Sequence, residues 1–220
     1  MSGKPRTIIF ANGWMGQPPQ LEPAISSEDL IIAADGGALH CLELGLRPAV
    51  VIGDLDSVPA EALERLQAQG AEILRYPTRK DYTDLELALQ YAREHGLRQV
   101  LLAAALGRRW DMTLANLLLP AALPEIEVRL VDGPQEIFLV RPGAEVEIAG
   151  RLGDTVSLIP LAGDTHGVTT RGLEYPLHAE TLLFGGTRGV SNVLLGEPAG
   201  VQIETGMLIC VVIHAPGELP

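Results

Sequence analysis

The residues best suited to chemistry are aspartates that stand directly after short apolar runs. Asp35 follows the run Leu30–Ala34. Asp54 and Asp56 follow the run Ala49–Ile52. Later runs are followed by three more aspartates: Asp81, Asp84 and Asp111. Carboxylate oxygens are ligands that Mg²⁺ prefers, commonly one or two of them together with waters and substrate phosphates. These aspartates therefore indicate magnesium-dependent chemistry on a phosphorylated substrate.

The apolar runs are typical of strands buried on both faces, because their apolar residues are continuous rather than alternating. The first half has five of them: Thr7–Ala11, Leu30–Ala34, Ala49–Ile52, Glu72–Tyr76 and Gln99–Ala105. Helices are expected between them: Ala38–Leu44, Pro59–Gln69 and Thr83–His95. Alternation of strands and helices predicts a parallel sheet with right-handed crossovers. The carboxyl ends of these strands then meet at one edge, where open α/β sheets bind ligands.

Six aspartates gathered at one edge would repel one another, and a divalent cation relieves that repulsion. Asp54 and Asp56 are two residues apart, which on an extended segment places both side chains on one face. Asp84 is expected in the first turn of a helix that begins with a capping box formed by Thr83 and Glu86. A single aspartate after a strand more often caps a helix or closes a turn. A binding site is indicated only because all six aspartates are expected at the same edge of the sheet.

Basic residues and a glycine pair are expected at the same edge. Arg79-Lys80 and Arg108-Arg109 are candidates to offset phosphate charge in a transition state. Gly36-Gly37 stands before a predicted helix, where its backbone N–H groups either approach a phosphate or form a tight turn. Trp110 either stacks on a purine or packs in the core or at a rim. The chain has no Walker A sequence and no GxGxxG, which excludes a P-loop enzyme and an ordinary dinucleotide-binding protein.

The second half has a different pattern. After Pro124 the apolar runs are short, and Glu145–Ile148 alternates strictly, as a half-buried antiparallel strand does. No helix is predicted there. The predicted strands are Val128–Val131, Glu136–Val140, Glu145–Ile148, Thr155–Ile159, Gly167–Thr170, Val201–Glu204 and Leu208–Ile213. We therefore expect an N-terminal parallel-sheet α/β domain over residues 1–132 and a C-terminal all-β domain over residues 133–220.

Charge and composition narrow the function further. The chain of 220 residues carries a formal net charge of −12 at pH 7, which argues against a nucleic-acid partner, because such affinity comes largely from neutralised phosphates. Its longest apolar runs have seven residues, whereas a membrane span needs about 20, so no membrane partner is expected. The N-terminus has no signal-peptide pattern and the two cysteines form no CxxC, so a reducing cytoplasm is the expected location.

Taken together, these segments resemble the thiamine pyrophosphokinase (thiamine diphosphokinase) family. The resemblance runs from about residue 8 to residue 213. In the α/β half it rests on Ala34-Asp35-Gly36-Gly37, Ile52–Ser57, Lys80-Asp81-Tyr82-Thr83-Asp84 and Asp111–Leu117. In the β half it rests on Ser157–Leu161, Gly167–Leu177 and Gly189–Asn192.

The resemblance implies transfer of a diphosphate group from ATP, the co-substrate, to the hydroxyethyl group of thiamine, with AMP as the second product. It also implies Mg²⁺, a β-sandwich for the second domain, and a homodimer that binds thiamine between its subunits. By position, it implies Asp54, Asp56 and Asp84 as metal ligands. Ser191 and Asn192 are implied on the thiamine side. On the nucleotide side it implies Asn12, Asp35, Gly36, Gly37, Thr83, Arg109 and Asp111.

The expected mechanism is in-line attack by an alcohol on the β-phosphorus of MgATP, in which the protein mainly positions groups and stabilises charge. Either Asp81 or Asp84 accepts the alcohol proton, and both stay open. The catalytic candidates are Asp54, Asp56, Lys80, Asp81 and Asp84.

The nucleotide loop departs from the family pattern. It reads Gly107-Arg108-Arg109-Trp110-Asp111-Met112, where the family usually has Gly-Gly-Arg-x-Asp-His. Two alternatives therefore stay open. One is a diphosphokinase for another alcohol, such as a hydroxymethyl pterin. The other is a nucleotide-binding module without catalysis.

Overall fold

The computed structural model describes residues 6–15, 25–107, 109–196 and 198–215. The chain divides into two compact units, Met1–Gly133 and Pro134–Pro220. The first unit is α/β and the second is all-β, which confirms the fold class expected from the sequence. No helix in the described ranges has the length and apolar character needed to cross a membrane.

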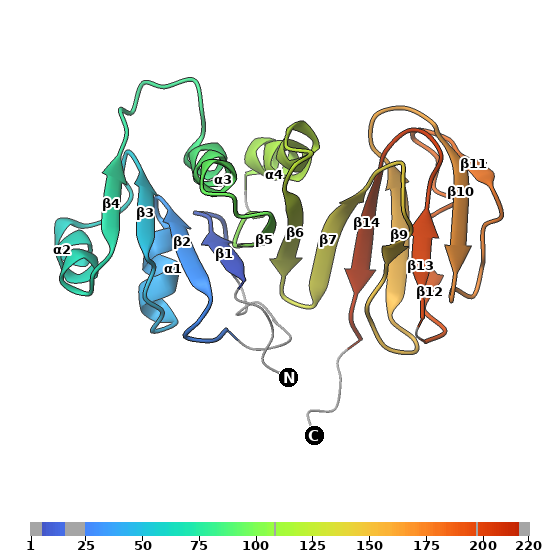
Figure 1. Cartoon of the computed structure of the whole chain (residues 1–220), viewed down its shortest axis with the longest axis horizontal. Helices are drawn as coiled ribbons and strands as arrows, with labels where there is room; N and C mark the ends of the chain where they lie inside the picture. Colours follow the sequence, from blue (N-terminus) through green and yellow to red (C-terminus); the bar gives the residue numbers. More distant parts are fainter. Residues whose placement is uncertain (1–5, 16–24, 108, 197, 216–220) are drawn as a thin grey trace. The chain divides into compact units, whose positions relative to one another are not determined.

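The first unit contains six parallel strands in the order β6-β5-β1-β2-β3-β4 (Figure 1). Their bounds are β1 Thr7–Phe10, β2 Leu30–Ala34, β3 Val50–Gly53, β4 Glu72–Arg75, β5 Gln99–Ala103 and β6 Glu127–Asp132. The helices are α1 Gly37–Glu43, α2 Ala60–Ala68, α3 Asp84–Glu94 and α4 Trp110–Leu118, followed by the 3₁₀ helix η1 Leu119–Ala122. The carboxyl ends of the strands share one edge, as predicted.

Successive strand residues serve opposite faces of this sheet, as a pleated strand requires. Phe10, Ala33 and Val51 share one apolar core with Cys41 of α1 and Leu66 of α2. Helix α3 also packs on β2 and β3, but its buried side chains contribute nothing to that core. Strands β1, β2 and β3 are therefore covered on both faces, which explains their continuous apolar character. The same prediction was wrong for β4, an edge strand in which no residue is fully buried.

Helix α4 was not predicted from the sequence. Its apolar side chains Trp110, Leu114 and Leu118 are exposed, whereas its polar residues Thr113 and Asn116 are buried. No side chain caps its first turn. The helix therefore lacks both the apolar inner face and the start signal by which a helix is recognised in a sequence.

The second unit contains two antiparallel sheets, ordered β12-β9-β14-β7 and β11-β10-β13-β8. Their strands are β7 Gln135–Val140, β8 Val146–Glu147, β9 Thr155–Pro160, β10 Thr165–Arg171, β11 Glu180–Leu182, β12 Asn192–Val193, β13 Gly200–Gln202 and β14 Leu208–Ile213. Leu158 and Cys210 of the first sheet share a core with Val168 and Val201 of the second. The unit is therefore a β-sandwich. Its short strands β11 and β12 were not predicted.

Candidate active site

A cleft of about 650 Å³ lies in the α/β unit, at the carboxyl ends of its strands. Its walls come from the segments after β1, β2, β3 and β5, from the loop before α3, and from α4. The lining includes Asn12, Trp14, Asp35, Asp54, Lys80, Thr83, Asp84, Leu106, Gly107, Arg109 and Met112. This is the position at which open α/β sheets bind ligands.

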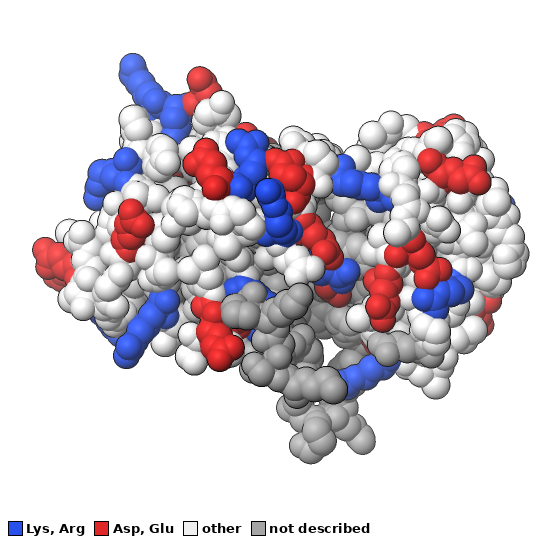
Figure 2. All heavy atoms as spheres, viewed as in Figure 1, with Lys and Arg blue, Asp and Glu red and all other residues white. Residues whose placement is uncertain are grey.

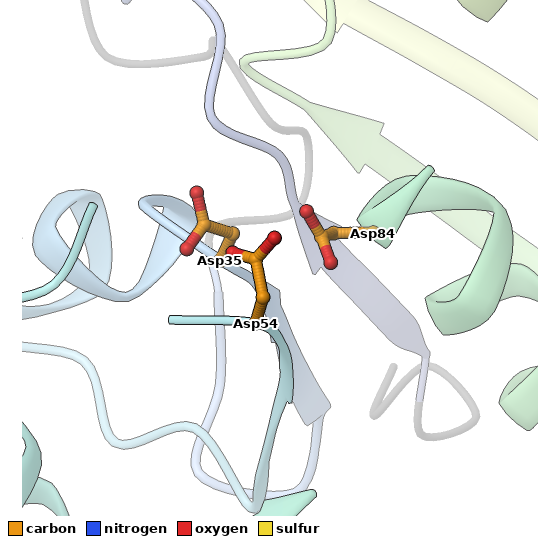
Figure 3. Close-up of side chains that lie close together, drawn as sticks. All are labelled: Asp35, Asp54 and Asp84. Atoms are coloured by element: carbon orange, nitrogen blue, oxygen red, sulfur yellow. The ribbon is translucent and has the colours of Figure 1, made fainter. Parts of the chain in front are cut away.

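Three carboxylates meet in this cleft. Asp35 follows β2, Asp54 follows β3 and Asp84 is the first residue of α3. Each offers one oxygen, and these oxygens lie within 4.8 Å of one another (Figure 3). Oxygen ligands at this spacing suit a hard divalent cation.

Backbone geometry at the strand ends decides which aspartates meet. Asp35 has a φ of +47°, and its backbone N–H donates to the carbonyl of Ile52 at 2.8 Å. Leu55 has a φ of +64° and buries its side chain, so the chain turns sharply between Asp54 and Asp56. Both conformations lie in the sparsely populated left-handed region, which recurs at functional sites.

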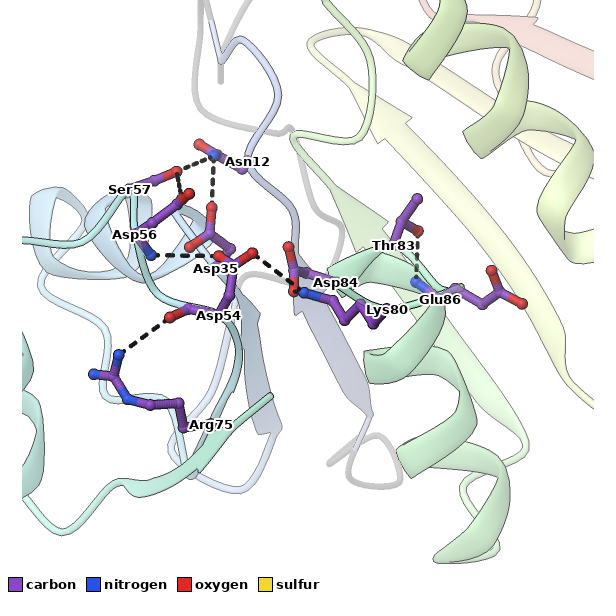
Figure 4. Close-up of polar contacts among 10 residues, drawn as sticks. All are labelled: Asn12, Asp35, Asp54, Asp56, Ser57, Arg75, Lys80, Thr83, Asp84 and Glu86. Atoms are coloured by element: carbon purple, nitrogen blue, oxygen red, sulfur yellow. Dashed lines mark hydrogen bonds and ion pairs between the residues drawn. The ribbon is translucent and has the colours of Figure 1, made fainter. Parts of the chain in front are cut away.

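Because Leu55 breaks the extended segment that the sequence predicted, Asp56 does not share the face of Asp54. Asp56 is exposed and lies outside the cleft lining, and Asp35 occupies the third position of the carboxylate group instead. Asp56 is still linked to that group. Ser57 Oγ donates to Asp56 Oδ1 at 3.2 Å, and Asn12 Nδ2 lies within hydrogen-bond distance of both Ser57 Oγ (3.3 Å) and Asp35 Oδ2 (3.0 Å) (Figure 4).

Among the described ion pairs, only Lys80 contacts members of this carboxylate group. Its Nζ lies 3.3 Å from Asp54 Oδ2 and 2.9 Å from Asp84 Oδ1 (Figure 4). Three carboxylates and one ammonium leave a formal charge of −2. Asp35 Oδ1 is buried and makes no hydrogen bond in the described part of the chain. The residual charge and the unpartnered oxygen both fit a divalent cation, because a buried charge needs a partner.

The pKa values of Asp54 and Lys80 favour their charged forms. Burial acts to raise the pKa of Asp54, but hydrogen bonds from the Asp56 backbone N–H and from Lys80 outweigh it and hold that pKa below its ordinary value. Burial acts to lower the pKa of Lys80, but its contacts with Asp84 and Asp54 outweigh that effect and raise it. At neutral pH Lys80 therefore carries a full charge, and Asp54 is a weak proton acceptor.

Thr83 caps α3 as the sequence predicted, since its Oγ1 accepts a hydrogen bond from the Glu86 backbone N–H at 3.2 Å (Figure 4). The cap sets the start of the helix and with it the position of Asp84. Asp81, the other candidate proton acceptor, is exposed and outside the cleft lining.

The glycine pair makes a close approach between elements. A Cβ on Gly37 would lie 2.0 Å from the carbonyl oxygen of Phe10, and one on Gly36 would lie 2.1 Å from Asn12 Oδ1. Neither glycine lines the cleft. Their visible role is therefore to let α1 begin against the end of β1.

The apolar side chains of Trp14, Leu106 and Met112 also line the cleft. Arg109 also lines it and is paired with Asp111 at 2.5 Å. Trp110, the sequence candidate for stacking, is 76% exposed and lies outside the lining, whereas Trp14 was missed. No pattern in the sequence distinguishes the two tryptophans, because only the path of the loop after β1 brings Trp14 into the cleft. Arg108 lies outside the described residues.

Ser191 and Asn192 belong to the β-sandwich unit. Ser191 is exposed and has a φ of +62°. Asn192 is buried, accepts hydrogen bonds from the backbone N–H groups of Tyr175 and Val193, and donates to the Tyr175 carbonyl at 2.7 Å. It borders a hollow of about 460 Å³ together with Tyr175 and Arg188. Asn192 therefore positions the wall of this hollow through bonds that are already satisfied.

Two family models match the chain in succession. The model described as thiamin pyrophosphokinase, catalytic domain, matches residues 21–130, and the model described as thiamin pyrophosphokinase, vitamin B1 binding domain, matches residues 144–209. The chain belongs to the thiamine pyrophosphokinase family. The catalytic-domain match covers the three carboxylates and Lys80, and the vitamin B1 binding match covers Ser191 and Asn192.

Known thiamine pyrophosphokinases resemble the chain over nearly its whole length. The enzyme of Bacillus subtilis (strain 168) is 29% identical over 205 residues, which is 92% of this chain and 96% of that protein. A crystal structure of thiamine pyrophosphokinase from Bacillus subtilis superimposes with a TM-score of 0.82 and 29% identity, covering 96% of this chain and all of that one. A crystal structure of thiamin pyrophosphokinase from Geobacillus thermodenitrificans superimposes with a TM-score of 0.83 and 27% sequence identity. The match covers 97% of this chain and 99% of that one.

Proposed function

We propose that this protein is a thiamine diphosphokinase, which transfers a diphosphate group from MgATP to the hydroxyl of thiamine. The thiamine oxygen attacks the β-phosphorus, the bond from that phosphorus to the oxygen of the α-phosphate breaks, and AMP leaves. The hydroxyl proton passes to a base. The observation that carries this proposal is the carboxylate group with Lys80, in a cleft inside the segment matched by the family's catalytic-domain model.

The residues of the cleft have separate roles in this proposal. Asp35, Asp54 and Asp84 would hold Mg²⁺, which when bound neutralises charge on the phosphate oxygens. Lys80 supplies a permanent positive charge beside them, and this charge favours a transition state in which negative charge builds up on the transferred group. Of the two candidate proton acceptors, Asp84 lines the cleft and Asp81 does not. Because Asp84 is also paired with Lys80 and assigned to the metal, which makes it a weak base, the choice between them stays open.

The remaining residues of the cleft are assigned to the nucleotide. Asn12, Thr83 and Arg109 line it and offer an amide, a hydroxyl and a guanidinium to phosphate or ribose oxygens. Asp111 orients Arg109, and Gly36 with Gly37 allows Asn12 to lie beside Asp35. Asp56 supports the same arrangement through Ser57.

Thiamine is assigned to the β-sandwich unit, beside Ser191 and the hollow bordered by Tyr175 and Asn192. We further propose a homodimer, with thiamine bound between subunits. Large apolar side chains are exposed on this unit, among them Leu183 and Phe184, each 62% exposed. Clustered exposed apolar residues are typical of interfaces. Sedimentation should show a dimer for the natural protein and a monomer for Phe184→Glu, whereas Leu152→Glu, on a separate turn, should stay dimeric.

The location proposed for the protein is the cytoplasm. We propose no nucleic-acid or membrane partner. The net charge is −12, and on the face shown in Figure 2 basic side chains lie beside acidic ones. Among the described residues on that face, no continuous basic area is present that could follow a phosphate backbone.

The decisive experiment is an assay for AMP release by the purified protein with MgATP and thiamine. We expect AMP and thiamine diphosphate in equal amounts, and no AMP when thiamine is omitted. Asp54→Asn should reduce turnover by about two orders of magnitude or more while the thermal unfolding midpoint stays close to that of the parent. Formation of ADP, or AMP release that does not depend on thiamine, would refute the proposal.

The same assay tests the two alternatives. A hydroxymethyl pterin in place of thiamine should give no AMP above background, and turnover with thiamine excludes a module without catalysis. The family models and relatives favour neither alternative.

A further inference from the structure

We infer that Trp14 is the platform on which the nucleobase of the nucleotide stacks, an inference that rests on the proposed use of ATP. The lining of the cleft is of two chemical kinds. Asp35, Asp54 and Lys80 are charged, whereas Trp14, Leu106 and Met112 are apolar. ATP is likewise charged at its triphosphate and aromatic at its base. The charged residues are assigned to phosphate, so the apolar residues are assigned to the base.

The backbone at Trp14 is held in place by the loop after β5. The Trp14 backbone N–H donates to the Leu106 carbonyl at 2.9 Å, and the Gly13 backbone N–H donates to Ala104 at 2.7 Å. His40 Nε2 donates to the Gly13 carbonyl at 2.9 Å. These three bonds fix the position from which the indole projects.

The partner loop is itself anchored to α4. The Gly107 backbone N–H donates to Thr113 Oγ1 at 3.2 Å, and Asn116 Nδ2 donates to the Ala105 carbonyl at 2.6 Å. A Cβ on Gly107 would lie 2.7 Å from the Trp14 backbone nitrogen, so this glycine lets the two loops touch. A preorganised platform costs little ordering when a ligand binds, which favours a binding role.

The indole of Trp14 nevertheless remains 55% exposed, although it lines a concave site. No aromatic ring in the described part of the chain stacks on it. A large apolar ring left accessible in a cleft gains free energy when a flat ligand covers it, and a purine matches its shape. Trp110 is also accessible, but it lies outside the cleft and provides a matched control.

Fluorescence tests the inference directly, because the chain has only two tryptophans. In Trp110→Phe the emission comes from Trp14, and addition of AMP or MgATP without thiamine should quench it in a saturable way. In Trp14→Phe the emission comes from Trp110, and the same additions should leave it unchanged. Saturable quenching only in Trp14→Phe would overturn the inference, as would its absence from both variants.

Kinetics gives a second, independent test. Base–aromatic stacking is typically worth about 1–3 kcal/mol, so Trp14→Ala should raise the KM for ATP by roughly tenfold, with kcat changed by less than about twofold. Trp14→Phe should restore most of the affinity, and Trp110→Ala should leave KM unchanged. Thermal unfolding checks that the variants are folded. An unchanged KM in Trp14→Ala would overturn the inference.

The two tests separate this inference from the proposed function. If the parent protein binds ATP by calorimetry but makes no AMP from thiamine, the proposed function fails, and the fluorescence result still decides the role of Trp14. If thiamine is turned over normally and Trp14→Ala binds ATP as tightly as the parent, only the inference about Trp14 fails.

Discussion

At the scale of single residues, the site depends on which aspartates form the carboxylate group. Three oxygens come together because Asp35 and Leu55 adopt left-handed backbone conformations at the ends of β2 and β3. Such conformations cost about 1–3 kcal/mol each and persist only where the surrounding structure holds them. Here the buried side chain of Leu55 and the hydrogen bond from Asp35 to Ile52 hold them. The strained backbone conformations at these two residues are thus maintained by the contacts that surround them.

This geometry predicts different metal dependences for two neighbouring aspartates. Asp35→Asn removes a charge from the carboxylate group, so it should raise the Mg²⁺ concentration needed for half-maximal AMP formation by roughly tenfold. Asp56→Asn removes a charge outside the group and should have a smaller effect. The measurement is a magnesium titration of both variants at saturating ATP and thiamine. A larger effect from Asp56→Asn would place Asp56, rather than Asp35, beside the metal.

The same residues show how far sequence reasoning reaches. The position of aspartates after strands is enough to predict a carboxylate-rich edge, because parallel strands end together. The choice between Asp35 and Asp56 depends on the φ angle of Leu55, which residue spacing does not encode. The choice between Trp14 and Trp110 depends on the course of two loops. The position of residues relative to predicted strands is enough to predict where the site lies. Which residues belong to the site depends on tertiary contacts.

At the scale of elements, β1 and α1 approach each other closely near the site. Gly37 allows α1 to begin against the carbonyl of Phe10, since a Cβ there would lie 2.0 Å from that oxygen. The clash is with backbone, which has little freedom to move. Gly36 differs, because its Cβ would meet the side chain of Asn12. We therefore expect substitution of Gly37 to affect mainly stability and substitution of Gly36 to affect mainly the position of Asn12.

We expect Gly37→Ala to lower the free energy of unfolding by about 3 kcal/mol, near the upper end for overpacking in a core. Gly36→Ala should lower it by less, because Asn12 can rotate, but it should raise the KM for ATP. Denaturant unfolding and ATP kinetics on both variants measure the two effects. Equal loss of stability in the two variants would contradict this assignment.

Elements also differ in how well they were predicted. The strands of the α/β unit and helix α3 carry clear signals, since continuous apolar runs and the Thr83 cap are local properties. Helix α4 carries none, because Thr113 and Asn116 are buried where they anchor the loop after β5, while Trp110 is exposed. Its sequence is adapted to the site rather than to the helix pattern. An element that departs from its expected pattern is often one that serves function.

At the scale of the whole molecule, stability in acid depends on a buried pair that joins the starts of two neighbouring strands. Arg6 precedes β1 and Asp29 precedes β2, and their side chains lie 2.8 Å apart, with the Asp29 side chain 3% exposed. Burial acts to raise the pKa of Asp29, but hydrogen bonds from Arg6 and Ser26 outweigh it and lower that pKa to about 2, against 3.8 in a free chain.

Because the folded pKa of Asp29 lies below its unfolded value, its contribution is complete above about pH 4 and is lost as the pH falls towards 2. That contribution is roughly 2 kcal/mol. Asp29→Asn should therefore lower stability at pH 7 by about this amount and flatten the loss between about pH 4 and pH 2. Denaturant midpoints across pH measure it. Glu94→Gln, an exposed carboxylate, is the control, and an equally steep acid loss in Asp29→Asn would contradict the prediction.

The two cysteines report on the two units separately. Cys41 lies in the core of the α/β unit and Cys210 in the core of the sandwich, and both side chains are fully buried. Burial raises the pKa of Cys41 to about 12, and the reactive species is the thiolate, so Cys41 should not react with a disulfide reagent in the folded protein. Cys210 should not react either, because its side chain is inaccessible. Because each unit has its own core, the thiols should become reactive at different denaturant concentrations. In Cys41→Ala the remaining thiol, Cys210, reports on the sandwich, and in Cys210→Ala the remaining thiol, Cys41, reports on the α/β unit. The same denaturant midpoint in both variants would show that the units unfold together.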